Sequence, residues 1–251
     1  MNTVLAFLKR RWWLTQERLF STLILVFITP VILYLLIHLP LNAIIVRSVR
    51  NIPYGDWALP GYLMIVSFFG LIPTIYRDFF ELRLHGKALF PITLTPVSKI
   101  EIVMGILITA IVESIIYLLF SLIVFLMLID VSYRWFDFLI IFFYLIIQMA
   151  LIGNVIIMLA LLAKRVTTFL PVVLLILAVY IFGSGMIFEF EFYPAQIGGI
   201  LKYLPTSLIL DNLRTILFTR YFIWWSFLIP IGIIISLVIA NSKILRYVVK
   251  Q

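Results

Sequence analysis

Six apolar stretches of about 20 residues or more follow one another along this sequence. They run over residues 19–41, 58–76, 102–129, 138–163, 168–188 and 222–240. A helix of about 20 apolar residues crosses the hydrocarbon core of a bilayer and satisfies its own backbone hydrogen bonds there. We therefore predict an all-α fold, a polytopic membrane protein with six transmembrane helices.

The composition supports this prediction and limits what else the chain contains. Hydrophobic residues make up 65% of the 251 residues and charged residues 12%, whereas soluble proteins average about 45–50% and 25%. So little sequence lies outside the apolar stretches that we expect a single transmembrane domain over residues 1–251. Cysteine is absent, which excludes a disulfide framework and a thiolate metal site.

The basic charge of the chain predicts its orientation. In a membrane protein, a net charge of +8 reflects the positive-inside rule more often than nucleic-acid binding, so we expect no nucleic acid partner. With the N-terminus inside, thirteen Lys and Arg residues fall on the cytoplasmic side and six outside. All six tryptophans also lie near predicted span ends. We expect a multi-pass protein of the cell (inner or cytoplasmic) membrane, surrounded by lipids, with both termini cytoplasmic.

Residues 1–18 combine apolar side chains with a basic cluster. Val4, Leu5, Leu8 and Trp12 recur at helical spacing, and the basic residues 9–11 fall mostly elsewhere around the helix. This pattern predicts a helix lying in the membrane interface. The alternative is an ordinary basic flank of the first span.

Residues 77–101 interrupt the apolar sequence with charge. Seven of these twenty-five residues are charged, and burying them in hydrocarbon at about 2.5–3.5 kcal/mol each would cost on the order of 20 kcal/mol. The segment is therefore expected in water or against another protein, between the second and third spans.

The stretch over residues 189–221 is expected to be more than a plain loop. It contains Pro194 and Pro205, and Ile209, Leu213 and Leu217 then recur at four-residue spacing. We predict one or two short interfacial helices on the outer face before the last span. Within them Asp211 and Arg214, three residues apart, are placed to pair.

A few polar residues lie inside or at the mouths of the predicted spans. Glu113 is the acidic residue well inside a span, and such a carboxylate has either a substrate or cation role or a structural, hydrogen-bonded one. Gln148 and Asn154 are either its partners on a substrate path or simple interhelical hydrogen-bonding groups. Glu189 and Glu191, at the outer mouth, are expected to be solvated, with contact to a cationic substrate as the alternative.

The sequence carries no recognisable catalytic motif, so we expect no enzymatic activity and assign no catalytic residue. A G-x-x-x-x-G-K-[ST] phosphate loop is absent, because Gly86-Lys87 lacks the upstream glycine and the following hydroxyl residue. His38 and His85 lie far apart, which argues against a histidine metal site. No cofactor is expected to bind to this chain directly.

Two stretches resemble a known family of transporters. The segment from Arg83 to Gly86 followed by ITLTPVSKIEIVMGIL resembles the loop between the second and third spans of type-2 ABC transporter permeases. The matching positions are Gly86, Thr95, Pro96, Val97, Ser98, Glu101 and Gly105. In this chain the family's acidic residue before the glycine is Leu84 or is displaced to Glu81, Lys87 replaces a threonine, and the Gly-to-Pro distance is one residue longer.

The second stretch is SGMIFEFEFYPAQIGGILKYLPTSLILDNLR. It is similar to the family's pattern of Ser-Gly, an aromatic residue, Pro, an amphipathic turn, Pro-Thr and a terminal Arg. The matching positions are Ser184, Gly185, Pro194, Pro205, Thr206, Asp211 and Arg214. With Pro60-Gly61, the basic N-terminal segment and six spans, the resemblance covers nearly the whole chain.

The resemblance implies a half-transporter, the permease subunit of an ABC exporter. Such permeases dimerise, usually as homodimers, and bind two copies of a cytoplasmic ABC ATPase, where ATP and Mg would bind. Residues 77–99 would then form a coupling helix seated in the ATPase. The docking residues implied in this way are Arg77, Asp78, Glu81, Arg83, Leu84, Gly86, Lys87, Leu89 and Phe90.

Other functions remain open at this point. The main alternative is a self-sufficient ion- or proton-coupled carrier or channel that uses Glu113. A scaffold or membrane enzyme has no supporting motif. The mostly apolar spans favour an amphipathic, lipid-like or drug-like cargo over a hydrophilic polymer.

Overall fold

The computed structural model describes residues 2–16, 19–45, 47–48, 51–81, 83 and 97–249. In this part of the chain the regular structure is helical, apart from an isolated β-bridge between Arg47 and Pro53. The prediction of an all-helical fold is therefore confirmed for the described residues.

Six helical segments among the described residues are long and apolar enough to cross a membrane, as predicted. The first combines α2 (Leu19–Leu33), the π-helix η1 (Tyr34–His38) and α3 (Leu39–Ile44), and the second combines α4 (Tyr54–Ile75) and the π-helix η2 (Tyr76–Glu81). The other four are α7 (Lys99–Leu128), α8 (Trp135–Leu162), α9 (Val166–Gly183) and α12 (Trp224–Val249).

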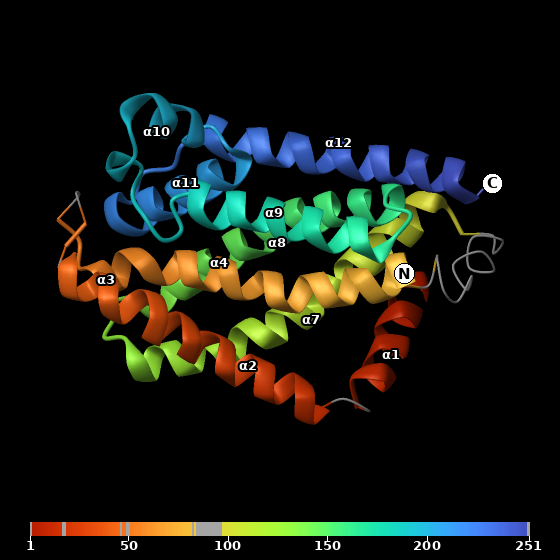
Figure 1. Ribbon diagram of the computed structural model, residues 1–251, viewed down its shortest axis with the longest axis horizontal. Helices are drawn as coiled ribbons and strands as arrows, with labels where there is room; N and C mark the ends of the chain where they lie inside the picture. The colour runs from red at the N-terminus through yellow and green to blue at the C-terminus, as the bar shows by residue number, and fades with distance from the viewer. Residues whose placement is uncertain are drawn as a thin grey trace.

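The long helices lie along the long axis of the molecule, and the short helices lie at its ends (Figure 1). Helix α1 (Asn2–Gln16) runs across the bundle near the end where α12 finishes, which we call the terminal end. The 3₁₀ turn η3 (Phe190–Phe192), α10 (Ala195–Leu201) and α11 (Pro205–Thr219) occupy the stretch before the last span, where one or two short helices were predicted. Helices α10 and α11 lie at the opposite end, which we call the loop end.

Helix α4 forms the centre of the bundle. In the most apolar 18-residue stretch of the α4–η2 segment, 83% is buried inside the bundle. The corresponding value for α9 is 17%, so most of α9 faces outward. Two glycines allow neighbours to approach the α4 backbone closely: a Cβ on Gly70 would lie 2.8 Å from the Cα of Ser114 in α7, and a Cβ on Gly61 would lie 2.3 Å from the carbonyl oxygen of Met186. The close packing around α4 therefore depends on glycine at positions 61 and 70, where any side chain would collide with a neighbouring backbone.

Two carboxylates connect separate elements at the loop end. Asp56, in the first turn of α4, accepts hydrogen bonds from the backbone N–H of Ser132 at 2.8 Å and from its hydroxyl at 2.6 Å. Asp137, in the first turn of α8, pairs with Arg220 at 2.6 Å, directly after α11. The Tyr133 hydroxyl donates to the Asp56 carbonyl, and burial raises the pKa of Tyr133 so that it remains a donor. These contacts fix the N-terminus of α4 to the connection between α7 and α8, and the N-terminus of α8 to the residue that follows α11.

Candidate functional site

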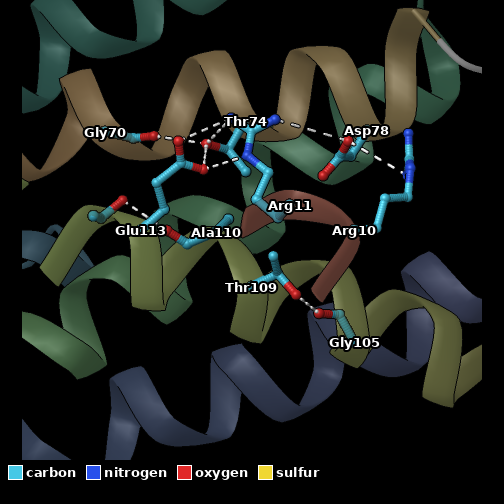
Figure 2. Close-up of polar contacts among 10 residues, drawn as sticks. Arg10, Arg11, Gly70, Thr74, Asp78, Gly105, Thr109, Ala110 and Glu113 are labelled. Carbon is cyan, nitrogen blue, oxygen red and sulfur yellow. Dashed lines mark hydrogen bonds and ion pairs between the residues drawn. The ribbon is translucent and has the colours of Figure 1, made fainter. Parts of the chain in front are cut away.

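A buried ionic network joins three helices near the terminal end (Figure 2). Arg11 of α1 reaches Glu113 of α7, with Nε 2.5 Å from Oε2 and Nη2 3.0 Å from Oε1. The Thr74 hydroxyl of α4 lies 2.7 Å from Oε2 of the same carboxylate and accepts a hydrogen bond from Arg11 Nη2 at 3.0 Å. The bidentate geometry and the added hydroxyl satisfy charges that would be costly to bury alone.

The network continues into the helix that leads to the polar segment. Asp78 of η2 is only 4% exposed, and its Oδ1 lies 3.7 Å from Arg10 and 4.0 Å from Arg11. Arg11 itself is 6% exposed. The carboxylate that the resemblance assigns to docking on a partner therefore faces the N-terminal helix of its own chain.

Helix α1 is seated by two residues one turn apart. The Phe7 ring occupies the space beside Gly105 of α7, where a Cβ would come within 2.9 Å of it, and Arg11 enters the network four residues later. Trp12 and Trp13 are each 61% exposed, as expected of side chains at an interface. Arg11 is the departure from expectation: grouped by sequence with Lys9 and Arg10, it turns inward and is buried.

Arg83 joins the start of the polar segment to α8. Its guanidinium donates to the carbonyl oxygens of Leu161 and Ala163, at the C-terminal end of that helix. The last carbonyls of a helix lack intrahelical donors and carry partial negative charge, so a guanidinium stabilises them. Burial lowers the pKa of Arg83, and these carbonyls favour its charged form.

The structure describes only part of the coupling segment implied by the resemblance. Arg77 and Asp78 lie in η2, which ends at Glu81, and Arg83 contacts α8. The remaining candidates lie outside the described residues: Leu84, Gly86, Lys87, Leu89 and Phe90. Ser98 then caps α7, where its hydroxyl accepts a hydrogen bond from the N–H of Glu101 at 3.2 Å.

The other two intramembrane candidates do not join Glu113 in the described contacts. Asn154 accepts a hydrogen bond at Oδ1 from the Asn241 amide of α12 at 3.2 Å, and its carbonyl accepts another from that amide at 2.9 Å. It is therefore an interhelical contact between α8 and α12. Gln148 is fully buried, and neither its Oε1 nor its Nε2 has a hydrogen-bond partner among the described residues.

Replacing Gln148 by leucine is expected to increase stability. A buried amide without partners carries a desolvation penalty of about 1–3 kcal/mol, which an apolar side chain of similar size removes. We expect the free energy of unfolding in mixed micelles to rise by about 1 kcal/mol or more. The matched change Asn154→Leu removes a partnered amide and should lower it, and a loss of stability in Gln148→Leu would contradict the assignment.

A polar pocket of about 230 Å³ lies at the loop end. It is lined from α4 by Trp57, from the segment after α9 by Gly185 and Glu189, and from α11 and α12. Its charged lining residues are Glu189, Glu191, Lys202, Asp211 and Arg214, and its aromatic ones include Trp57, Phe190, Tyr203 and Trp225. Charge and aromatic surface thus meet in one concave site.

Arg214 organises one wall of this pocket. Its Nε donates to the Trp57 carbonyl at 3.1 Å, its Nη1 donates to the Gly185 carbonyl at 2.7 Å, and its guanidinium lies 3.6 Å from the Trp57 ring centroid. Gly185 has a φ of +72°, a conformation that favours glycine. In this conformation its carbonyl accepts the hydrogen bond from Arg214 Nη1. Arg214 therefore connects α11 to α4 and to the turn after α9.

The two outer-mouth glutamates differ in environment. Glu191 is exposed and pairs with Lys202 at 3.2 Å. Glu189 is only 6% exposed and lines the pocket, so the expectation that it is solvated was wrong. The chain turns Glu189 inward because the following residues form η3, whose Phe190 packs against Gly185.

A second hollow, almost entirely apolar, lies beside the ionic network. This groove of about 280 Å³ is bounded by α1, α2 and α7, and Arg11 and Glu113 line part of it. Its apolar lining residues are Leu8, Trp12, Leu23, Val26, Val112, Ile116 and Phe120.

Three features of these sites were not singled out from the sequence. They are the burial of Arg11, its contact with Thr74, and the presence of Trp57 and Lys202 in the pocket. Only the intramembrane carboxylate of Glu113 gave a signal, since it required a partner that the sequence did not identify.

Among the described residues, no group of three or more His, Cys, Asp or Glu side chains is placed to hold a metal ion. Comparison with known protein families finds no family that matches this chain. Comparison with characterised proteins finds no matching relative.

Proposed function

We propose that this chain is the transmembrane permease subunit of an ATP-driven exporter, resembling the type-2 ABC permeases and powered by a separate cytoplasmic ATPase. Two copies of the permease, most simply a homodimer, would bind two copies of the ATPase. In this proposal the terminal end is cytoplasmic, and ATP and Mg bind to the ATPase.

The proposal rests on the contacts that Asp78 and Arg83 make at the start of the polar segment. Asp78 lies against Arg10 and Arg11 of α1, and Arg83 binds the last carbonyls of α8. A force applied to residues 77–99 would therefore act on α1, α4 and α8 together, and on α7, which begins at Lys99 and is also held to α1 by the Arg11–Glu113 pair. A subunit driven by an external motor needs such a mechanical connection between its docking segment and its spans.

The apolar groove supports an amphipathic cargo. It lies next to α1 at the terminal end and combines apolar walls with an ionic edge, which suits a lipid-like or drug-like molecule. The low burial of α2 and α9, at 22% and 17% of their apolar windows, leaves surface for lipid or a second copy.

The contacts of Glu113 do not favour the alternative of a proton-coupled carrier. Its carboxylate is held by Arg11 and Thr74, so protonation would break a buried ion pair. We therefore assign Glu113 a structural role.

Crosslinking provides a direct test, because the chain has no cysteine. A single cysteine in place of Lys87, modified in native membranes with a short crosslinker that carries one thiol-reactive and one photoreactive group, is expected to capture a nucleotide-hydrolysing subunit. The control Lys243→Cys, at an exposed position near the end of α12, should not capture it.

An activity measurement complements the crosslink. In the purified complex, Lys87→Glu is expected to reduce cargo-stimulated ATP hydrolysis by about tenfold, the effect of losing about 1.4 kcal/mol of docking energy, whereas Lys243→Glu should leave it unchanged. Absence of any ATPase from the crosslinked products would contradict the proposal. So would transport by the purified chain alone in liposomes without ATP.

A further inference from the structure

The apolar groove beside the ionic network follows one face of α7. Its lining residues on that helix extend from Thr109 to Phe120 and recur every three or four positions. At a rise of about 1.5 Å per residue, this face is about 16 Å long. One leaflet contributes about 15 Å to the hydrocarbon core of a bilayer. The length of the groove therefore suits an acyl chain of a membrane lipid.

The walls of the groove belong to helices that leave much of their surface uncovered. The first span, which contains α2, and α7 are buried over only 22% and 28% of their most apolar stretches. Leu23 of α2 and Val112 and Ile116 of α7 line the groove and are 41%, 39% and 45% exposed. The groove is therefore open along two spans, where the surrounding solvent is lipid hydrocarbon.

Helix α1 marks the end of the groove that lies at headgroup level. It contacts α7 at Gly105 and Glu113, on either side of the first groove residue, Thr109. Trp12 and Trp13 of α1 are exposed, and tryptophans concentrate at the interface between membrane and water. The groove thus extends from α1 at the interface toward the middle of the membrane.

The charge beside this end of the groove is positive. Leu8 lines the groove, and the next residue, Lys9, is exposed and lies 5.5 Å from the Trp13 ring centroid. The carboxylates described next to α1, Asp78 and Glu113, both contact arginine side chains. A lysine at the membrane surface attracts anionic lipids, which are enriched in the cytoplasmic leaflet. In the proposed orientation, α1 lies at that leaflet.

We propose that the groove binds an anionic phospholipid, with one acyl chain along α7 between α1 and α2 and the headgroup beside Lys9. The inference narrows the ligand of a groove that the proposed function assigns to cargo, and its orientation in the membrane rests on that function. Binding itself needs no ATPase. Absence of an ATPase would overturn the proposed function alone, and absence of lipid binding would overturn this inference alone.

Two phospholipids with identical acyl chains test the role of the headgroup. Dioleoyl-phosphatidylglycerol and dioleoyl-phosphatidylcholine are titrated into the delipidated full chain in detergent, and native mass spectrometry counts the lipids bound per chain. We expect one saturable site that binds phosphatidylglycerol at least about fivefold more tightly, which corresponds to about 1 kcal/mol for one lysine. Lys9→Gln should abolish this preference, whereas Lys243→Gln, at an exposed position near the end of α12, should retain it. Equal affinity of the unaltered chain for the two lipids would overturn the proposal.

Substitutions on α7 locate the acyl chain. Ile116→Trp fills the groove from a position that is 45% exposed, and it is expected to weaken the binding of both lipids by at least about tenfold. Leu119→Trp, at a position 46% exposed but outside the lining, should leave binding unchanged. If Ile116→Trp does not fold, Val112→Phe decides in its place. Unchanged lipid binding in the folded variant, or a change in oligomeric state in place of a change in lipid binding, would show that the groove does not hold the lipid.

Discussion

Replacing Glu113 by leucine is expected to lower the free energy of unfolding by about 3–5 kcal/mol. The substitution leaves the Arg11 guanidinium, 6% exposed, without the carboxylate that it now contacts through both Nε and Nη2. Asp78 lies 4.0 Å from Arg11, farther than the two Glu113 oxygens, and a buried charge that has lost its closest partner is among the largest single-residue penalties in proteins. Reversible unfolding of the chain in mixed micelles with increasing SDS measures the change.

The double variant Arg11→Leu with Glu113→Leu provides the decisive comparison. It removes both charges, so most of the stability lost in Glu113→Leu should return. Glu101→Gln, at an exposed position on the same helix, serves as the control and should change stability by less than about 0.5 kcal/mol. A double variant no more stable than Glu113→Leu would show that Arg11 and Glu113 do not depend on each other.

Gly61→Val is the second substitution with a large expected effect, of about 3 kcal/mol in the free energy of unfolding. A Cβ at this position would lie 2.3 Å from the carbonyl oxygen of Met186, a backbone atom that cannot move independently. Relief requires the segment around Met186 to leave α4, which would also displace the neighbouring Gly185 carbonyl from Arg214.

Two other glycines control for this change. A Cβ on Gly199 or Gly232 would meet no atom within 4 Å among the described residues. Gly199→Ala in α10 and Gly232→Ala in α12 should be neutral or slightly stabilising, because alanine favours a helix. If Gly61→Val unfolds at the same denaturant concentration as these variants, the close packing of Met186 on α4 is wrong.

The fold was predictable from the sequence because each span is a continuous apolar run. All six spans were located, but several helices extend beyond the apolar stretches. Helix α4 begins at Tyr54 rather than at residue 58, and α12 continues to Val249 although Lys243 and Arg246 lie within it. Helix ends depend on local hydrogen bonds and on which face of the helix a charged residue occupies. Hydropathy indicates only which residues can lie in the hydrocarbon core of the membrane.

The sites were only partly predictable because they depend on contacts distant in sequence. The position of Glu113 inside a span indicated that it needs a partner. The sequence did not distinguish Arg11 from Lys9 and Arg10, because the rotation of α1 depends on the packing of Phe7 against Gly105. Glu189 and Glu191 likewise differ by two residues and appear equivalent in sequence. Both line the pocket, but Glu189, directly before the η3 turn, is buried, whereas Glu191, within it, is exposed and pairs with Lys202.

The Arg11–Glu113 pair has a consequence for biogenesis, because its members are separated by 102 positions. A ribosome makes α1 long before it makes the acceptor on the third span. Until then the guanidinium has no bidentate carboxylate and stays hydrated at the membrane surface, where an ammonium or guanidinium group is stable. The first helix synthesised can therefore seat against α7 only after the third span has been made, so the order of synthesis differs from the order of assembly.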